Sequence, residues 1–161
     1  MKVLLAHNYY QSSAPSGEDV VFNNEYELLN GNGVDVIKFE RFNDDIDDST
    51  LYSKLKVAHQ GAWSRSSYRE IDQLIKKNKP DIAHFHNTFP LITPSAYAAC
   101  KDNGVPVVQT LHNYRLFCAN GQLLRDNKPC ELCINGALHN AFKHKCYRNS
   151  RLATSAMLWI L

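Results

Sequence analysis

The sequence predicts an α/β fold built on a doubly wound parallel sheet. Short apolar runs alternate with amphipathic helical patterns over residues 1–111, and this alternation is typical of parallel strands joined by helical crossovers. Strong turn signals separate the elements, among them the run Asn30-Gly31-Asn32-Gly33. The chain has 161 residues, which is enough for one domain with a hydrophobic core.

Each strand is expected where an apolar run lies between turn signals. The four expected strands are residues 2–6, 34–39, 82–86 and 105–111. The first helix is expected to begin at Ser16, because Ser16 and Asp19 have the spacing of a capping box. A second helix is expected over residues 69–79. A third is expected to use Thr93 as its cap and Pro94 at its first helical position.

Histidine and asparagine side chains follow three of the four expected strands. Each such histidine, taken alone, is more often a hydrogen-bonding group at a strand end than a ligand-binding residue. Because the carboxyl ends of parallel strands share one edge, where open α/β sheets bind ligands, the repetition predicts a shared cleft. The residues that follow the strands are His7-Asn8-Tyr9, His86-Asn87 and His112-Asn113-Tyr114-Arg115, with His84 on the same face as His86.

The loop Ser16-Gly17 leads to the same edge. A glycine at a helix N-terminus lets backbone N–H groups approach an anion such as a phosphate. The sequence contains no GxGxxG fingerprint and no P-loop, so the phosphate site is predicted from this one glycine.

Composition excludes several classes of protein. The formal net charge of +2 with neutral histidines is too small to imply binding to nucleic acid or a membrane. The apolar run Val3 to Ala6 is too short for a signal peptide, and no apolar run has the length of a membrane span. The expected location is therefore cytoplasmic.

Three stretches together resemble the N-terminal half of a family 4, GT-B-type glycosyltransferase, and the resemblance covers nearly the whole chain. Its most specific motifs are Pro80 to Asn87 and Thr110 to Tyr114. The stretches read "MKVLLAHNYY", "SGEDVVFNNEYELLNGNGVDV" and "PDIAHFHNTFPLITPSAYAACKDNGVPVVQTLHNYR". The resemblance implies a Rossmann-like sheet that forms one half of a GT-B fold. It also implies a retaining enzyme that transfers sugar from a nucleotide-sugar donor to a saccharide or lipid-linked acceptor, as in bacterial surface polysaccharide synthesis.

The resemblance also implies roles for particular residues. His112 would contact the donor sugar near the reacting carbon and is the expected catalytic residue. Ser16-Gly17 stands where family members usually carry two glycines, which leaves the exact phosphate contact open. No metal is expected to be required for catalysis. The expected donor-binding residues are Gly17, Ser16 and Asn113, and the expected acceptor-cleft residues are His86, Asn87, His7 and Tyr114.

Four cysteines form the pattern C-x11-C-x2-C-x12-C. They suffice for a tetrahedral structural zinc site in a loop-rich segment, although the usual pattern has two paired knuckles. Two disulfides and unpaired thiols remain as alternatives, and His139 or His144 could replace one thiolate. Cys100 is expected to be a small buried apolar residue. The four are Cys118, Cys130, Cys133 and Cys146.

A basic stretch with interleaved aromatic residues is consistent with peripheral contact with the inner face of a membrane, and an ordinary helix surface is the favoured alternative. The residues are Lys54, Lys56, Trp63, Arg65 and Arg69. The basic segment from Lys143 to Arg151 carries few aromatic residues for base stacking, so no nucleic acid partner is expected.

The chain is expected to divide at residue 148. Residues 1–148 would form the acceptor-side domain with its Cys-rich segment 118–146, and residues 149–161 would begin an apolar helix. That helix is expected to lead to, or pack on, a C-terminal domain of the same protein, without which the chain would be inactive. The alternative function is a non-catalytic, zinc-stabilised α/β module that binds sugar or nucleic acid.

Overall fold

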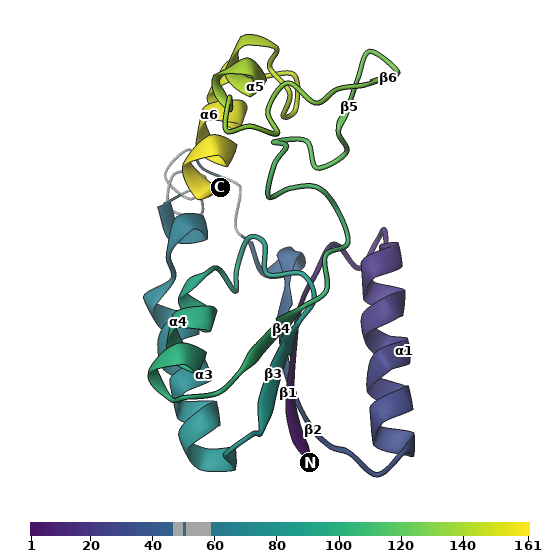
Figure 1. Ribbon diagram of the computed structural model, residues 1–161, viewed down its shortest axis with the longest axis vertical. Helices are drawn as coiled ribbons and strands as arrows, with labels where there is room; N and C mark the ends of the chain where they lie inside the picture. The colour runs from purple at the N-terminus through teal and green to yellow at the C-terminus, as the bar shows by residue number, and fades with distance from the viewer. Residues whose placement is uncertain (47–49, 51–58) are drawn as a thin grey trace. The chain divides into compact units, whose positions relative to one another are not determined.

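The computed structural model describes residues 1–46, 50 and 59–161 (Figure 1). The chain forms two compact units, Met1–His112 and Asn113–Leu161. The first unit thus ends after the fourth strand region, and the domain boundary expected at residue 148 stays a prediction. The Cys-rich segment belongs to the same compact unit as the last helix.

The first unit is an α/β layer structure, which confirms the predicted fold class. Its four strands are all parallel and have the order β2-β1-β3-β4. Helix α1 covers one face of the sheet, and α3 and α4 cover the other (Figure 1). The elements are β1 (Lys2–Tyr9), α1 (Gly17–Gly31), β2 (Asp35–Phe42), a 3-10 turn η1 (Asn43–Asp45), α3 (Arg65–Asn78), β3 (Ile82–Phe85), α4 (Ser95–Asp102) and β4 (Val107–Gln109).

Local signals explain where the first two helices begin. The predicted capping box at α1 is present: the Ser16 side chain accepts the Asp19 N–H, and the Asp19 carboxylate accepts the Ser16 N–H. Ser64 caps α3 by accepting the Ser67 N–H. These bonds satisfy N–H groups that no helical carbonyl can reach.

The predicted cap of α4 is wrong. The Thr93 hydroxyl accepts a hydrogen bond from the Ser64 N–H, 3.1 Å away. It also forms a hydrogen bond with the Ser95 hydroxyl. Thr93 therefore joins the start of α3 to the start of α4, and Pro94 precedes α4 without a side-chain cap. A tertiary hydrogen bond has replaced the local one.

The main hydrophobic core lies between the sheet and the pair α3–α4. Alternate residues of β1 and β3 point toward these helices, as the two-residue period of a strand requires. The core residues include Leu4, Ala6, Phe39, Ile71, Ile75, Ala83, Phe85, Ile92, Ala96, Ala99 and Cys100. Cys100 is fully buried, as predicted, and burial raises the pKa of its thiol to about 11.

Strand β4 is shorter and more exposed than predicted. It covers Val107–Gln109 at the edge of the sheet, and both of its valines are exposed. An edge strand has a neighbour on one side only, so the apolar run from Val105 does not become a central strand.

The second unit is built from short elements. Its strands β5 (Leu124–Arg125) and β6 (Lys128–Pro129) pair antiparallel, and helices α5 (His139–Lys143) and α6 (Arg151–Ile160) follow. Ser150 caps α6 by accepting the Ala153 N–H. Among the described helices, none has the length and apolarity that crossing a membrane would require.

Candidate active site

The carboxyl edge of β1 and β3 is the topological switch point of the sheet. From β1 the chain winds outward to β2, and from β3 it winds outward to β4 in the opposite direction. Ligands of open α/β sheets bind at such a point. β1 ends in His7-Asn8-Tyr9, and His86-Asn87 directly follows β3, so the structure brings two of the three predicted His-Asn pairs to this edge.

His112 reaches the same place from the segment after β4. Its Nε2 atom lies 3.0 Å from Nδ1 of His86, and the two rings stack with centroids 5.2 Å apart. His86 is 1% exposed, whereas His112 is only partly buried. The predicted catalytic residue is therefore held by a buried partner from the segment that directly follows β3.

His7 supports this edge from inside the protein. Its ring is fully buried. Nδ1 accepts the Asn87 N–H at 3.3 Å, so Nε2 carries the ring proton and donates it to Asp19 at 2.8 Å. His7 thus connects the start of α1 to the loop after β3, and its burial leaves no surface for a bound acceptor.

The Asn87 side chain is also used internally. Its amide nitrogen donates to the Asn8 carbonyl at 2.9 Å, and its Oδ1 accepts the Phe89 N–H at 3.0 Å. Both polar ends of Asn87 therefore hold the backbone of the two strand ends together.

Burial keeps the inner histidines neutral. It lowers the pKa of His7, against the opposing effect of Asp19. Burial also lowers the pKa of His86 to about 3, and the neighbouring rings of His84, His112 and His7 lower it further. The Glu25 carboxylate acts in the opposite direction, because an anion favours a protonated imidazole.

Gly17 lies at the exposed start of α1, where a phosphate was predicted to bind. A Cβ atom added to Gly17 would meet nothing within 4 Å, so the backbone there faces open space. Asp19 is turned inward: burial would raise the pKa of its carboxyl, but the hydrogen bonds from His7 and Ser16 outweigh burial and lower it. Among the described hydrogen bonds, none uses the Gly17 N–H.

Asn113 and Tyr114 open the second unit. The Asn113 Oδ1 atom accepts the Arg115 N–H at 2.9 Å, and the Tyr114 N–H donates to the Gly121 carbonyl at 2.9 Å. Both bonds lie within the second unit. The expected role of Asn113 in donor binding and that of Tyr114 in the acceptor cleft therefore stay predictions.

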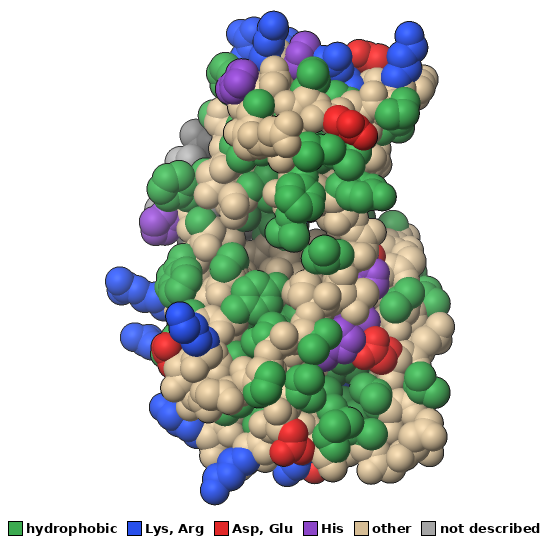
Figure 2. Space-filling view, in the orientation of Figure 1, with side chains coloured by type: hydrophobic (Ala, Val, Ile, Leu, Met, Phe, Trp, Pro, Cys, Tyr) green, Lys and Arg blue, Asp and Glu red, His purple; other side chains and the backbone are tan. Residues whose placement is uncertain are grey.

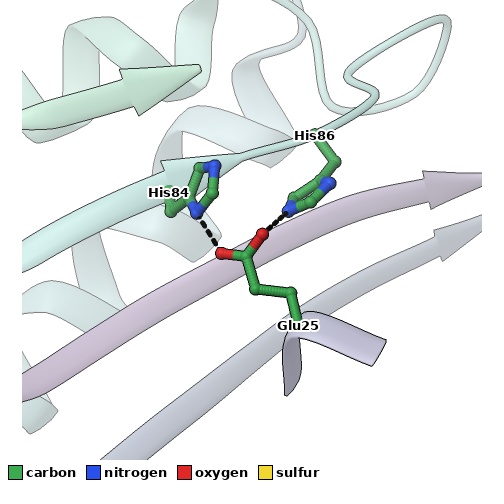
Figure 3. A group of neighbouring side chains, drawn as sticks. All are labelled: Glu25, His84 and His86. Carbon is green, nitrogen blue, oxygen red and sulfur yellow. Dashed lines mark ion pairs between the residues drawn. The ribbon is translucent and has the colours of Figure 1, made fainter. Parts of the chain in front are cut away.

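Sequence reasoning missed Glu25, which contacts the histidines of β3 (Figure 3). Its carboxylate lies 2.5 Å from His84 Nδ1 and 3.2 Å from His86 Nε2. A signal existed, because Glu25 follows Phe22 by three residues and so shares the buried face of the helix. Thr110 was missed as well, and its hydroxyl lies 2.8 Å from His84 Nε2.

A pocket of about 270 Å³ lies in the first unit. It is formed by the end of β2, the start of α3 and the loop after β3. Hydroxyl and guanidinium groups of this kind can hydrogen bond to a hydroxylated ligand, and none of the predicted site residues lines it. Its lining residues are Arg41, Asp45, Gln60, Ser64, Ser66, Ser67, Pro90 and Leu91.

Comparison with known protein families identifies the family to which the chain belongs. The family model described as Glycosyltransferase Family 4 matches residues 29–153, which is most of the chain. The chain belongs to glycosyltransferase family 4. Comparisons with curated proteins and with solved structures found no match. The match covers His84, His86, His112 and the four cysteines, while Gly17 and Glu25 precede it.

In this family 4 domain the four thiols of the second unit are free but interact. Burial raises the pKa of Cys133 and of Cys146, and the charges of the neighbouring thiols raise both further. The Cys118 thiol donates to Asn120 Oδ1 at 2.9 Å. Among the described residues, the cysteines do not form a group whose ligand atoms lie within 4.8 Å of one another. The zinc site stays a prediction.

The basic stretch is described only in part. Trp63, Arg65 and Arg69 are exposed in and just before α3. Lys54 and Lys56 lie outside the described residues. Peripheral membrane contact of the family 4 domain therefore stays a prediction, as does a cytoplasmic location.

The neutral state of buried His7 predicts acid sensitivity. Because the folded pKa lies below the ordinary value of 6.5, the unfolded chain binds more protons below that pH, and stability falls on acidification. The loss should reach at most about 1.4 kcal/mol per pH unit for one histidine. Urea unfolding at pH 7, 6 and 5 measures it. His7→Gln should show a shallower decline between pH 6.5 and 5, and an unchanged decline would contradict the assignment.

The cysteine pattern predicts one zinc ion in the second unit. Cys133→Ser should lose that ion, because three thiolates hold zinc less tightly than four. Zinc per protein is measured on purified protein, and cobalt substitution should give the charge-transfer absorption of thiolate ligands. Cys100→Ala is the matched control and should keep the metal. Folded wild-type protein in which the four thiols of the second unit are reactive and no zinc is bound would refute the prediction.

Proposed function

We propose that this family 4 domain is the N-terminal, acceptor-side half of a retaining glycosyltransferase. The enzyme would move a sugar from a nucleotide-sugar donor to a saccharide or lipid-linked acceptor in bacterial surface polysaccharide synthesis. The family assignment supports glycosyl transfer in general. The observation that carries the site is the contact between His86 and His112 at the switch point of the sheet.

His112 acts as a positioning and polarising group for the donor sugar. It is partly exposed and is held by a buried, neutral neighbour, so its ring is fixed while one edge remains accessible. Preorganised polar groups of this kind stabilise charge that develops in a transition state. The donor sugar lies against this accessible edge.

The start of α1 receives the donor diphosphate. Gly17 is exposed, and its N–H group is available at the positive end of a 15-residue helix. The Asp19 carboxylate is turned inward toward His7, so it does not face the approach of the phosphate. Release of the diphosphate is helped by these backbone dipoles, with no metal required for catalysis.

The acceptor enters from the side of the pocket at the start of α3. His86 is buried and Asn87 uses both polar ends of its side chain internally, so these two residues shape the cleft from behind. The hydroxyl-rich pocket at the start of α3 supplies hydrogen bonds to a saccharide.

Replacement of His112 tests the catalytic assignment. In the complete protein, His112→Ala should lower kcat by about 100-fold or more, the size of loss that follows removal of one preorganised transition-state contact. Donor affinity, measured by calorimetry, should change much less. His59→Ala is the control, because His59 is an exposed histidine of the same unit. Unchanged turnover in His112→Ala would overturn the role of His112.

Replacement of Gly17 tests the diphosphate site. Gly17→Ala adds a methyl group in open space, so folding should be unaffected. The methyl group should weaken nucleotide-sugar binding by roughly tenfold or more, the equivalent of one lost hydrogen bond. Gly31→Ala at the other end of α1 is a matched control, since a Cβ there also meets nothing within 4 Å. Equal donor affinity in both variants would remove Gly17 from the site.

A further inference from the structure

Glu25, His84 and His86 form a compact group on the α1 face of the sheet (Figure 3). His84 lies in β3 and His86 directly follows it, two residues later, so both point to the same face, and α1 brings the carboxylate between their rings. One ligand atom from each residue lies within 4.8 Å of the other two. We refer to these three residues as the Glu25 triad.

The triad contains a buried polar atom without a partner. His86 Nε2 is directed at the Glu25 carboxylate at 3.2 Å, but the two groups are not aligned for a hydrogen bond. Among the described residues it is the one buried side-chain nitrogen or oxygen atom without such a bond. An unmade bond of this kind costs free energy, and a bound ligand would satisfy it.

We propose that the Glu25 triad binds a divalent transition-metal ion, with zinc the ion that suits it best. Two imidazole nitrogens and one carboxylate are a zinc donor set that leaves a fourth position open. Glu25 and His84 keep 26% and 16% of their side-chain surface exposed, which provides a route for the ion. Figure 2 shows histidine and acidic side chains side by side at the surface of the sheet unit.

Both histidines have the outer partners that metal-binding imidazoles require. His84 would bind the ion through Nδ1, and its Nε2–H would donate to the Thr110 hydroxyl at 2.8 Å. His86 would bind it through Nε2, and its Nδ1–H would donate to His112 Nε2 at 3.0 Å. Such bonds fix the tautomer and orientation of a ligating ring.

Space for the ion comes from the Glu25 side chain. Its Oε1 atom now lies 2.5 Å from His84 Nδ1, so carboxylate and imidazole are in direct contact. Glutamate is flexible, and this one is partly exposed. A small rotation of the Glu25 carboxylate away from the sheet would leave room for an ion, which needs bonds of about 2.0–2.2 Å to all three donors.

The ion would also set the tautomer of His112, a consequence that rests on the proposed function. Without metal, the favoured His86 tautomer carries its proton on Nε2, facing the Glu25 carboxylate, and Nδ1 accepts from His112. With metal on Nε2, His86 donates from Nδ1 and His112 becomes the acceptor. The His112 Nδ1 atom then carries the proton and can donate to a sugar hydroxyl.

Metal titration tests the site without reference to glycosyl transfer. The protein is stripped with a chelator and titrated with Zn²⁺ by calorimetry and with Co²⁺ by visible absorption. Loss of a direct ligand in Glu25→Gln or His84→Gln should exceed the about 10–100-fold weakening that follows loss of an outer partner. Thr110→Val, which removes only the outer partner of His84, should fall within that range.

The controls separate this site from the cysteines and from unfolding. Glu27→Gln makes the same charge change on an exposed residue of α1 and should bind zinc like the wild type. Cobalt bound at the Glu25 triad should show ligand-field bands that persist in Cys133→Ser. Two results would overturn the proposal. One is that folded wild-type protein and folded Glu25→Gln bind the same number of ions, and the other is that Glu25→Gln and His84→Gln both keep wild-type affinity for zinc.

Nitrogen-15 spectra of the histidines test the link to His112. Zinc should move the ring proton of His112 from Nε2 to Nδ1 in the wild type and leave it unchanged in Glu25→Gln. An unchanged tautomer with zinc bound overturns the link while the metal site itself stands. Neither the metal titration nor the nitrogen-15 spectra measure glycosyl transfer. A protein without any transferase activity would therefore contradict the proposed function and leave the metal site untouched.

Discussion

The buried ring of His7 is the interaction on which the edge of the sheet depends. It accepts a backbone N–H from Asn87 and donates to Asp19, which itself completes the capping box of α1. One neutral imidazole thereby joins the end of β1, the start of α1 and the loop after β3. A protonated His7 could not accept from Asn87, so the geometry of this edge requires the neutral form that burial favours.

Much of this edge could be predicted because the signals are local. The period of a strand places His84 and His86 on one face, and the spacing of Ser16 and Asp19 alone predicts a capping box. The carboxyl ends of parallel strands share one edge whatever their order, so a common edge for His86 and His112 followed from recognising the strands. Their direct contact depends on β3 and β4 being neighbours, which the sequence did not predict. Family resemblance added the role of His112, which no spacing reveals.

The rest depended on contacts between distant segments. Glu25 meets His84 only because α1 packs on the face of the sheet to which His84 points, an arrangement that the sequence does not specify. Thr93 bonds to Ser64 instead of capping α4, and the apolar run after Val105 lies at an exposed edge. In each case the local preference was outweighed by a tertiary partner.

His86 has two neighbours that compete for one proton. Its ring can donate toward Glu25 or toward His112, but a neutral imidazole cannot do both. The first choice leaves a poorly aligned contact at 3.2 Å, and the second leaves a bare nitrogen facing a carboxylate. Protonating both nitrogens is opposed by burial. A cation at Nε2 resolves the conflict, because it satisfies the nitrogen and the carboxylate together and frees the remaining proton for His112.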